Sequence, residues 1–130
     1  MQSVLIVDDN PHIRAGLRKL LEDDAELRVC DEAADGLEAV RKAGEQRPAL
    51  ILMDLSMPKL NGVIAAARIR ELLPDTRIVV FTLFSDSFGK SMTHFVGADL
   101  VISKTDGING LMKELRKFLS VPRPNEKPLH

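Results

Sequence analysis

The chain has 130 residues, 45% of them hydrophobic and 28% charged, which suffices for one compact domain with an apolar core but not for a second. Eighteen basic and nineteen acidic residues give a formal net charge of −1, so overall charge draws this domain neither to nucleic acid nor to anionic lipid. The single cysteine, Cys30, excludes an internal disulfide, and no apolar run approaches the roughly 18 residues that span a bilayer. Because the first residues also lack the basic start of a signal peptide, we expect a cytoplasmic protein without a membrane role.

Strand and helix patterns alternate along the chain. Residues 4–7 form an apolar, β-branched run that predicts a strand buried on both faces. Asn10 and Pro11 follow as the cap and first turn of a helix. The same patterns predict strands at 27–33, 49–54, 77–82 and 100–103, and helices after Asp35-Gly36, after Gly62, over 85–96, and over 108–119 with a cap near Thr105 or Asp106.

Two of these helices have apolar stripes that predict which side chains are buried. In the second helix the stripe is Leu37, Val40 and Ala43, and the helix should end before Pro48. In the third, closed by Pro74, the stripe comprises Ala65, Ala66, Ile69, Leu72 and Leu73.

Alternation of this kind predicts a doubly wound α/β fold, in which helices cover both faces of a five-stranded parallel sheet. We expect one domain over residues 1–120. The proline-rich and polar residues 121–130 are expected to be a disordered tail or the start of a linker.

Polar side chains follow four of the predicted strands. Asp8 and Asp9 end the first strand, Asp54 the third and Thr82 the fourth, and Lys104 follows the fifth. Each has an ordinary structural explanation, but together they should meet at the carboxyl edge of the sheet, where ligands bind in this fold. Carboxylates at such short distances repel one another unless a cation neutralises their charge. Mg²⁺ suits this role because it prefers oxygen ligands, including those of phosphate. The site is thus suited to a phosphoryl group, which a carboxylate can attack to give an aspartyl phosphate.

The same residues carry a family resemblance that covers residues 4–119. The pattern resembles the receiver domain of bacterial two-component response regulators in these positions: Asp8-Asp9, Asp54 within Met-Asp-Leu-Ser-Met-Pro-Lys-Leu-Asn-Gly, Thr82, Gly97-Ala98 and Lys104. The resemblance implies a flavodoxin-like (βα)5 fold with strand order 2-1-3-4-5.

The resemblance also implies a role for each site residue. Asp54 is the phospho-acceptor, and Mg²⁺, with Mn²⁺ as an alternative, is held by Asp9, Asp54 and the Ser56 carbonyl, with Asp8 acting through water. Lys104 forms an ion pair with the phosphoryl group, and Thr82 moves toward the phosphoryl group on activation. The implied donor is a histidine kinase or a phosphotransfer protein, and the surface between the fourth and last helices allows a homodimer. Self-catalysed phosphotransfer and dephosphorylation would be the only chemistry, with no direct contact between this domain and nucleic acid.

Some positions depart from the family pattern. Val101 stands where an aromatic residue usually moves inward, and valine has no ring and a stiff χ1. Leu83 stands where a small residue is usual, and Phe84 follows it. We expect both to restrict entry of phosphodonor and water to Asp54, which predicts slow phosphorylation and a long-lived product.

Three other readings remain open. A degenerate receiver would act as a constitutive protein-binding module. Val101 and Leu83 allow this reading, and the complete acidic, Thr and Lys set argues against it. An Mg²⁺-dependent phosphohydrolase would use Asp54 as its nucleophile but generally needs a covering cap, for which no loop here is long enough. A flavin-binding module is weaker still, since no Gly-rich or Ser/Thr-rich phosphate loop follows the first strand.

Overall fold

The computed structural model describes residues 2–54, 62–82, 97–104 and 107–120, with Thr82, Ile108 and Asn109 described by their backbone alone. The predicted helix over 85–96, the helix cap at Thr105 or Asp106 and the segment 121–130 lie outside the described residues.

A five-stranded parallel sheet forms the centre of the molecule, with strand order β2-β1-β3-β4-β5. This confirms the predicted doubly wound, flavodoxin-like order. The direction of strand addition reverses at β1, so the crevice beyond the carboxyl ends of β1 and β3 is where this fold places ligands. The strands are β1 (Gln2–Val7), β2 (Leu27–Ala33), β3 (Leu50–Met53), β4 (Arg77–Thr82) and β5 (Leu100–Ser103).

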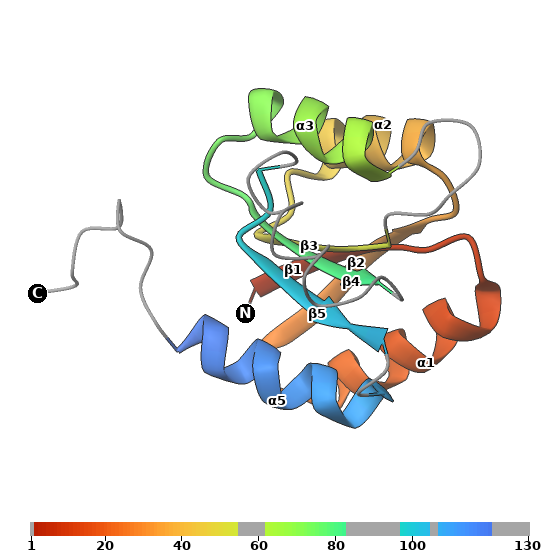
Figure 1. The fold of residues 1–130 in the computed structure, drawn as a ribbon, viewed down its shortest axis with the longest axis vertical. Helices are drawn as coiled ribbons and strands as arrows, with labels where there is room; N and C mark the ends of the chain where they lie inside the picture. Colours follow the sequence, from red (N-terminus) through yellow and green to blue (C-terminus); the bar gives the residue numbers. More distant parts are fainter. Residues whose placement is uncertain (1, 55–61, 83–96, 105–106, 121–130) are drawn as a thin grey trace, which may run out of the picture.

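Helices cover both faces of the sheet (Figure 1). On one face lie α2 (Gly36–Gln46) and α3 (Gly62–Leu72), and on the other lie α1 (Pro11–Glu22) and α5 (Gly107–Leu119). Successive residues of β1 alternate between two apolar cores, because side chains point to opposite faces of a strand. Leu5 and Val7 pack on the α2–α3 side, whereas Val4 and Ile6 pack on the α1–α5 side. The prediction of a strand buried on both faces is confirmed.

The helix starts predicted at Asn10 and at Asp35 are also confirmed. The Asn10 side chain accepts hydrogen bonds from the His12 and Ile13 amides, at 2.9 and 3.4 Å, with Pro11 as the first helical residue. At α2, Asp35 accepts a 2.8 Å hydrogen bond from the Glu38 amide. Each cap begins its helix directly after the β-strand segment that precedes it, so the strand ends are held close to the helix N-termini.

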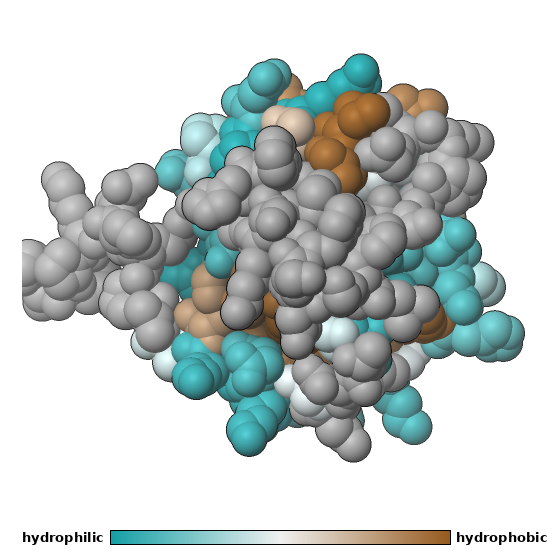
Figure 2. Space-filling view, in the orientation of Figure 1, coloured by the Kyte–Doolittle hydropathy of each residue, from teal (hydrophilic) through white to brown (hydrophobic). Residues whose placement is uncertain are grey.

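Two residues of the predicted apolar stripes are exposed instead of buried. Leu37 and Leu72 are 52% and 55% exposed. In α2 the buried residues are Gly36, Ala39 and Ala43, and one further residue turns a helix by about 100°, which places Leu37 at the edge of that face. Leu72 is the last residue of α3, and the next residue, Leu73, is buried in its place at 8% exposure. Figure 2 shows apolar surface over this α2–α3 layer.

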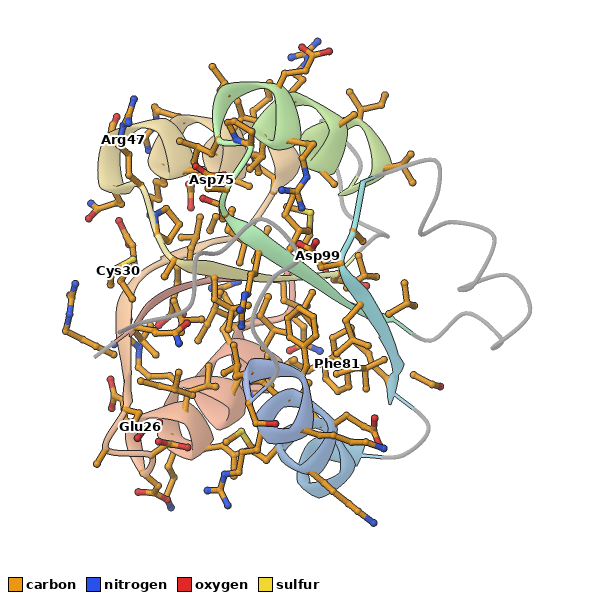
Figure 3. All side chains as sticks on the ribbon, turned by 90° about the vertical axis from the view of Figure 1, so that its left-hand side faces the viewer. Glu26, Cys30, Arg47, Asp75, Phe81 and Asp99 are labelled. Carbon is orange, nitrogen blue, oxygen red and sulfur yellow. The ribbon has the colours of Figure 1, made fainter. Side chains whose placement is uncertain are left out.

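Arg70 ties the end of α3 to the start of β5. Its guanidinium donates to the carbonyl oxygens of Gly97 (3.1 and 2.8 Å), Pro74 (2.8 Å) and Thr76 (2.8 Å), and pairs with Asp99 at 2.7 Å. Gly97 has φ +69°, and an added Cβ there would meet Arg70 Cγ at 3.2 Å. Asp99, labelled in Figure 3, precedes β5. Arg70 thus sets the start of the strand that leads to Lys104.

Replacing Arg70 with Met should destabilise the domain by about 2 kcal/mol, because several partly buried carbonyl groups lose a charged donor while the apolar stem is kept. The midpoint of urea unfolding measures the loss. Arg68→Met is the matched control, since Arg68 lies exposed on the same helix, and its midpoint should stay close to wild type. Equal midpoints for Arg70→Met and wild type would contradict the anchoring role.

Candidate functional site

Three carboxylates meet beyond the carboxyl ends of β1 and β3. Asp8, Asp9 and Asp54 each offer an oxygen, and these oxygens all lie within 4.8 Å of one another. Asp8 and Asp54 are 2% and 7% exposed, whereas Asp9 is exposed. The backbone holds the two buried residues in place, since the Asp54 amide donates to the Val7 carbonyl at 2.9 Å and the Asp8 amide donates to the Ala33 carbonyl at 3.0 Å. The predicted meeting of these side chains is thus found in the structure.

Lys104 closes the site from the end of β5. Its Nζ lies 3.0 Å from Asp8 Oδ2 and 3.6 Å from Asp54 Oδ2, and its side chain is 10% exposed. The other Asp8 oxygen accepts a 2.9 Å hydrogen bond from the Asn10 amide. The Lys104 ammonium also lies 5.7 Å from the centroid of the Phe81 ring, which lies on the α5 side of the sheet (Figure 3).

The charge of this group suits a divalent cation. Lys104 balances one of the three negative charges, and like charges at such short separations repel strongly when partly buried. All the donors are carboxylate oxygens, the ligands that the hard ions Mg²⁺ and Mn²⁺ prefer. The donor set of Asp8, Asp9 and Asp54 therefore fits the metal expected from the sequence.

The remaining predicted site residues are described in part or not at all. The backbone of Thr82 ends β4 and pairs with Ser103, the residue before Lys104, so the β4 and β5 ends are adjacent as expected. Ser56, Leu83 and Phe84 lie outside the described residues. Val101 is half-buried and packs against the α2–α3 core.

The structure adds two residues that sequence reasoning missed, Arg14 and Glu32. Arg14 Nη1 donates to the backbone carbonyl of Asp8 at 2.6 Å, and its Nε donates to Glu32 Oε1 at 3.0 Å. The second Glu32 oxygen accepts from Arg18. An arginine one turn into a helix gives no sequence signal of such a contact, because the contact depends on how α1 lies against β2.

The arginine pair sets the protonation of Glu32. Burial raises the Glu32 pKa, but hydrogen bonds and charge from Arg18 and Arg14 outweigh it and hold the pKa below its ordinary value of 4.5. A carboxyl group whose pKa is lower in the folded state stabilises the fold above its unfolded pKa. That contribution is lost as the pH falls through the folded pKa.

Replacing Glu32 with Gln should therefore cost about 1 kcal/mol at neutral pH. The difference from wild type should shrink as the pH is lowered below about 4.5, the ordinary Glu pKa, because the wild type then loses the same carboxylate charge. Urea unfolding at a series of pH values measures this. Glu45→Gln, which removes an exposed pairing with Arg41, should change little at any pH. A difference for Glu32→Gln that grew toward acid pH would contradict the assigned sign.

The sheet order and the acidic site at the strand ends define a domain of the doubly wound, flavodoxin-like class. Residues 4–116 match the family model described as the response regulator receiver domain. The chain belongs to this family. Receiver domains are signalling modules rather than enzymes of metabolism.

Relatives and solved structures agree with the family assignment. The chain is 35% identical over 114 residues to the response regulator protein VraR of Staphylococcus aureus, an alignment covering 88% of this chain and 54% of VraR. It is 43% identical over 83 residues to the uncharacterized transcriptional regulatory protein YhcZ of Bacillus subtilis, covering 64% of this chain and 39% of YhcZ. A LuxR-family two-component response regulator from Aurantimonas sp. SI85-9A1 has TM-score 0.84 at 31% identity, covering 92% of this chain and 86% of that one.

A structure from a different regulator is equally similar in fold. The response regulator domain of Thermotoga maritima CheB has TM-score 0.82 at 28% identity, covering 95% of this chain and 99% of that one. The chain spans about half the length, or less, of the two curated relatives. None of the described helices is long and apolar enough to cross a bilayer.

Proposed function

We propose that Asp54 accepts a phosphoryl group from a histidine kinase or a phosphotransfer protein, in an Mg²⁺-dependent reaction that switches the domain between two conformational populations. The observation that carries the proposal is the cluster of Asp8, Asp9 and Asp54 within 4.8 Å, with Lys104 against two of them. A site of this composition can accept a phosphoryl group and share its charge.

The chemistry of acceptance is a direct transfer. An Asp54 carboxylate oxygen attacks phosphorus, the bond from phosphorus to the donor nitrogen breaks, and the electron pair leaves with the donor imidazole, which takes up a proton. Mg²⁺, held by Asp9, Asp54 and the Ser56 carbonyl with Asp8 acting through water, would neutralise charge on the phosphoryl oxygens. Lys104 pairs with the same oxygens, and Thr82 donates a hydrogen bond to them once the group is in place.

Loss of the phosphoryl group by attack of water resets the domain without a further protein. Leu83 and Phe84 slow both steps by restricting access to Asp54, and Val101 provides no aromatic ring that could move inward on activation. These effects follow from the departures of Leu83 and Val101 from the family pattern, and Val101 is half-buried against the α2–α3 core.

We place the output in another domain, because the alignments cover only 54% and 39% of the two curated relatives. Residues 1–120 form the receiver, and 121–130 start a linker or tail. The relatives' names include a transcriptional regulatory protein, which supports control of transcription through another domain. The net charge of −1 supports a receiver that does not itself bind nucleic acid. A cytoplasmic location and a homodimer through the fourth- and last-helix face are part of the same proposal and follow from the family pattern.

The deciding experiment is incubation of the protein with Mg²⁺ and either a small phosphodonor or beryllium fluoride. With the phosphodonor, intact mass should show one added phosphoryl group, and NMR should locate the phosphoryl group or the bound beryllium fluoride at Asp54. Wild-type protein that stays unmodified at saturating Mg²⁺ would contradict the proposal and favour the degenerate, protein-binding receiver. Steady turnover of free phosphate esters would instead indicate a hydrolase.

A further inference from the structure

The two acidic residues after β1 share one peptide unit but differ in environment. Asp8 is 2% exposed and contacts Lys104, whereas Asp9 is exposed. A peptide unit is planar, so the direction of the Asp8 carbonyl sets the direction in which the chain leaves toward Asp9. Whatever holds that carbonyl oxygen also sets how the two carboxylates lie relative to one another.

Arg14 holds it. Its Nη1 donates to the Asp8 carbonyl oxygen at 2.6 Å, while its Nε donates to Glu32 Oε1 at 3.0 Å. The guanidinium is a rigid planar fork, so the two contacts fix the carbonyl relative to Glu32 on β2. Arg18 holds the other Glu32 oxygen, and the Arg14 side chain is only 19% exposed. The contacts from Asp8 through Arg14 to Glu32 brace the β1–α1 turn against β2, whereas Arg18 pairs with Glu32 and Glu22.

We propose that Arg14 is a positioning residue for the divalent cation, because it holds the Asp8–Asp9 peptide so that both carboxylates face one ion. The inference rests on the proposed function, in which these carboxylates bind Mg²⁺. Groups that orient metal ligands typically change metal affinity by about 10–100-fold when removed. The Arg14 charge alone acts in the opposite direction, since a nearby cation repels Mg²⁺. Loss of Arg14 should therefore weaken Mg²⁺ binding if its role is positioning, and tighten Mg²⁺ binding if only its charge matters.

The test compares Mg²⁺ dissociation constants for wild type, Arg14→Gln, Arg14→Lys and Arg18→Gln. The chain has no Trp and no Tyr, so amide NMR shifts during an MgCl₂ titration are the readout. Arg14→Gln should weaken Mg²⁺ binding by roughly 10-fold even though it removes a positive charge. Arg14→Lys keeps the charge but not the fork and should weaken binding too. Arg18→Gln removes the other positive charge that contacts Glu32 but leaves the hydrogen bond to the Asp8 carbonyl in place. It should leave Mg²⁺ binding unchanged or slightly tighter.

The rate of modification by a small phosphodonor gives a second readout. For Arg14→Gln the half-saturating Mg²⁺ concentration should rise, while the rate at saturating Mg²⁺ should stay near wild type, which a general loss of structure would not produce. Tighter Mg²⁺ binding by Arg14→Gln, or equal weakening by Arg18→Gln, would overturn the inference. If Arg14→Gln does not fold, Arg14→Lys decides, and wild-type affinity for it overturns the inference. Wild type that binds Mg²⁺ but is never modified overturns the proposed function alone.

Discussion

Asp54→Asn should abolish covalent modification by a small phosphodonor, because a carboxamide is not a nucleophile for phosphorus at neutral pH. The fold should be retained. Without metal, its stability should stay within about 1 kcal/mol of wild type, since loss of the 3.6 Å contact to Lys104 is offset by weaker repulsion from Asp8 and Asp9. Intact mass after incubation with Mg²⁺ and donor measures the first effect, and urea unfolding the second.

Asp9→Asn is the comparison within the same site. It removes a metal ligand but keeps the nucleophile, so modification should persist and require more Mg²⁺. Modification of Asp54→Asn to the wild-type extent would show that another residue accepts the phosphoryl group. Loss of modification in Asp9→Asn even at saturating Mg²⁺ would contradict the separation of ligand and acceptor roles.

Lys104→Met should lower the stability of the metal-free domain and increase the stabilisation that Mg²⁺ gives. Without metal it leaves Asp8 and Asp54, which are 2% and 7% exposed, without the ammonium at 3.0 and 3.6 Å. Removing one partner of a buried ion pair typically costs about 3–5 kcal/mol. With Mg²⁺ the cost should fall, because the cation replaces the missing positive charge, and Mg²⁺ should stabilise this variant more than it stabilises wild type. Urea unfolding with and without MgCl₂ measures both effects.

Phosphorylation separates the two roles of the same ammonium. Lys104→Met should be modified more slowly than wild type even when Mg²⁺ saturates it, since the phosphoryl group loses its ion-pair partner. Lys42→Met is the matched control, because Lys42 is partly buried and its carboxylate partners are Asp31 and Glu38 instead of the site residues. Its stability loss should be the same with and without Mg²⁺. A Lys104→Met loss that ignored Mg²⁺ would contradict the shared site.

Local patterns in the sequence were enough to predict the fold. Apolar runs of strand length, the caps at Asn10 and Asp35 and the alternation of strand and helix depend only on neighbours along the chain. They predicted a sheet buried on both faces, and the family pattern added its order. The site was predictable for a related reason. In a parallel sheet all carboxyl ends meet at one edge, so residues directly after strands, such as Asp8, Asp54 and Lys104, must lie near one another.

Periodicity was less reliable for the extent of burial. Leu37 and Leu72 are apolar and lie close to the buried face of their helices, yet more than half of each is exposed. A helical pattern gives the direction of a side chain but not the width of surface that the neighbouring elements cover. That width depends on how α2 and α3 pack together, which local sequence does not contain.

The sequence by itself determined the elements, their caps and the chemical groups at the strand ends. Only the tertiary structure decided how those groups are held. Lys104 contacts Asp8 more closely than Asp54, Arg14 holds the Asp8 carbonyl against Glu32, and Arg70 fixes the start of β5. The physical reason is that each such contact joins side chains to backbone groups or charges on other elements. Its length depends on the packing of whole helices against the sheet, which no spacing of residue types specifies.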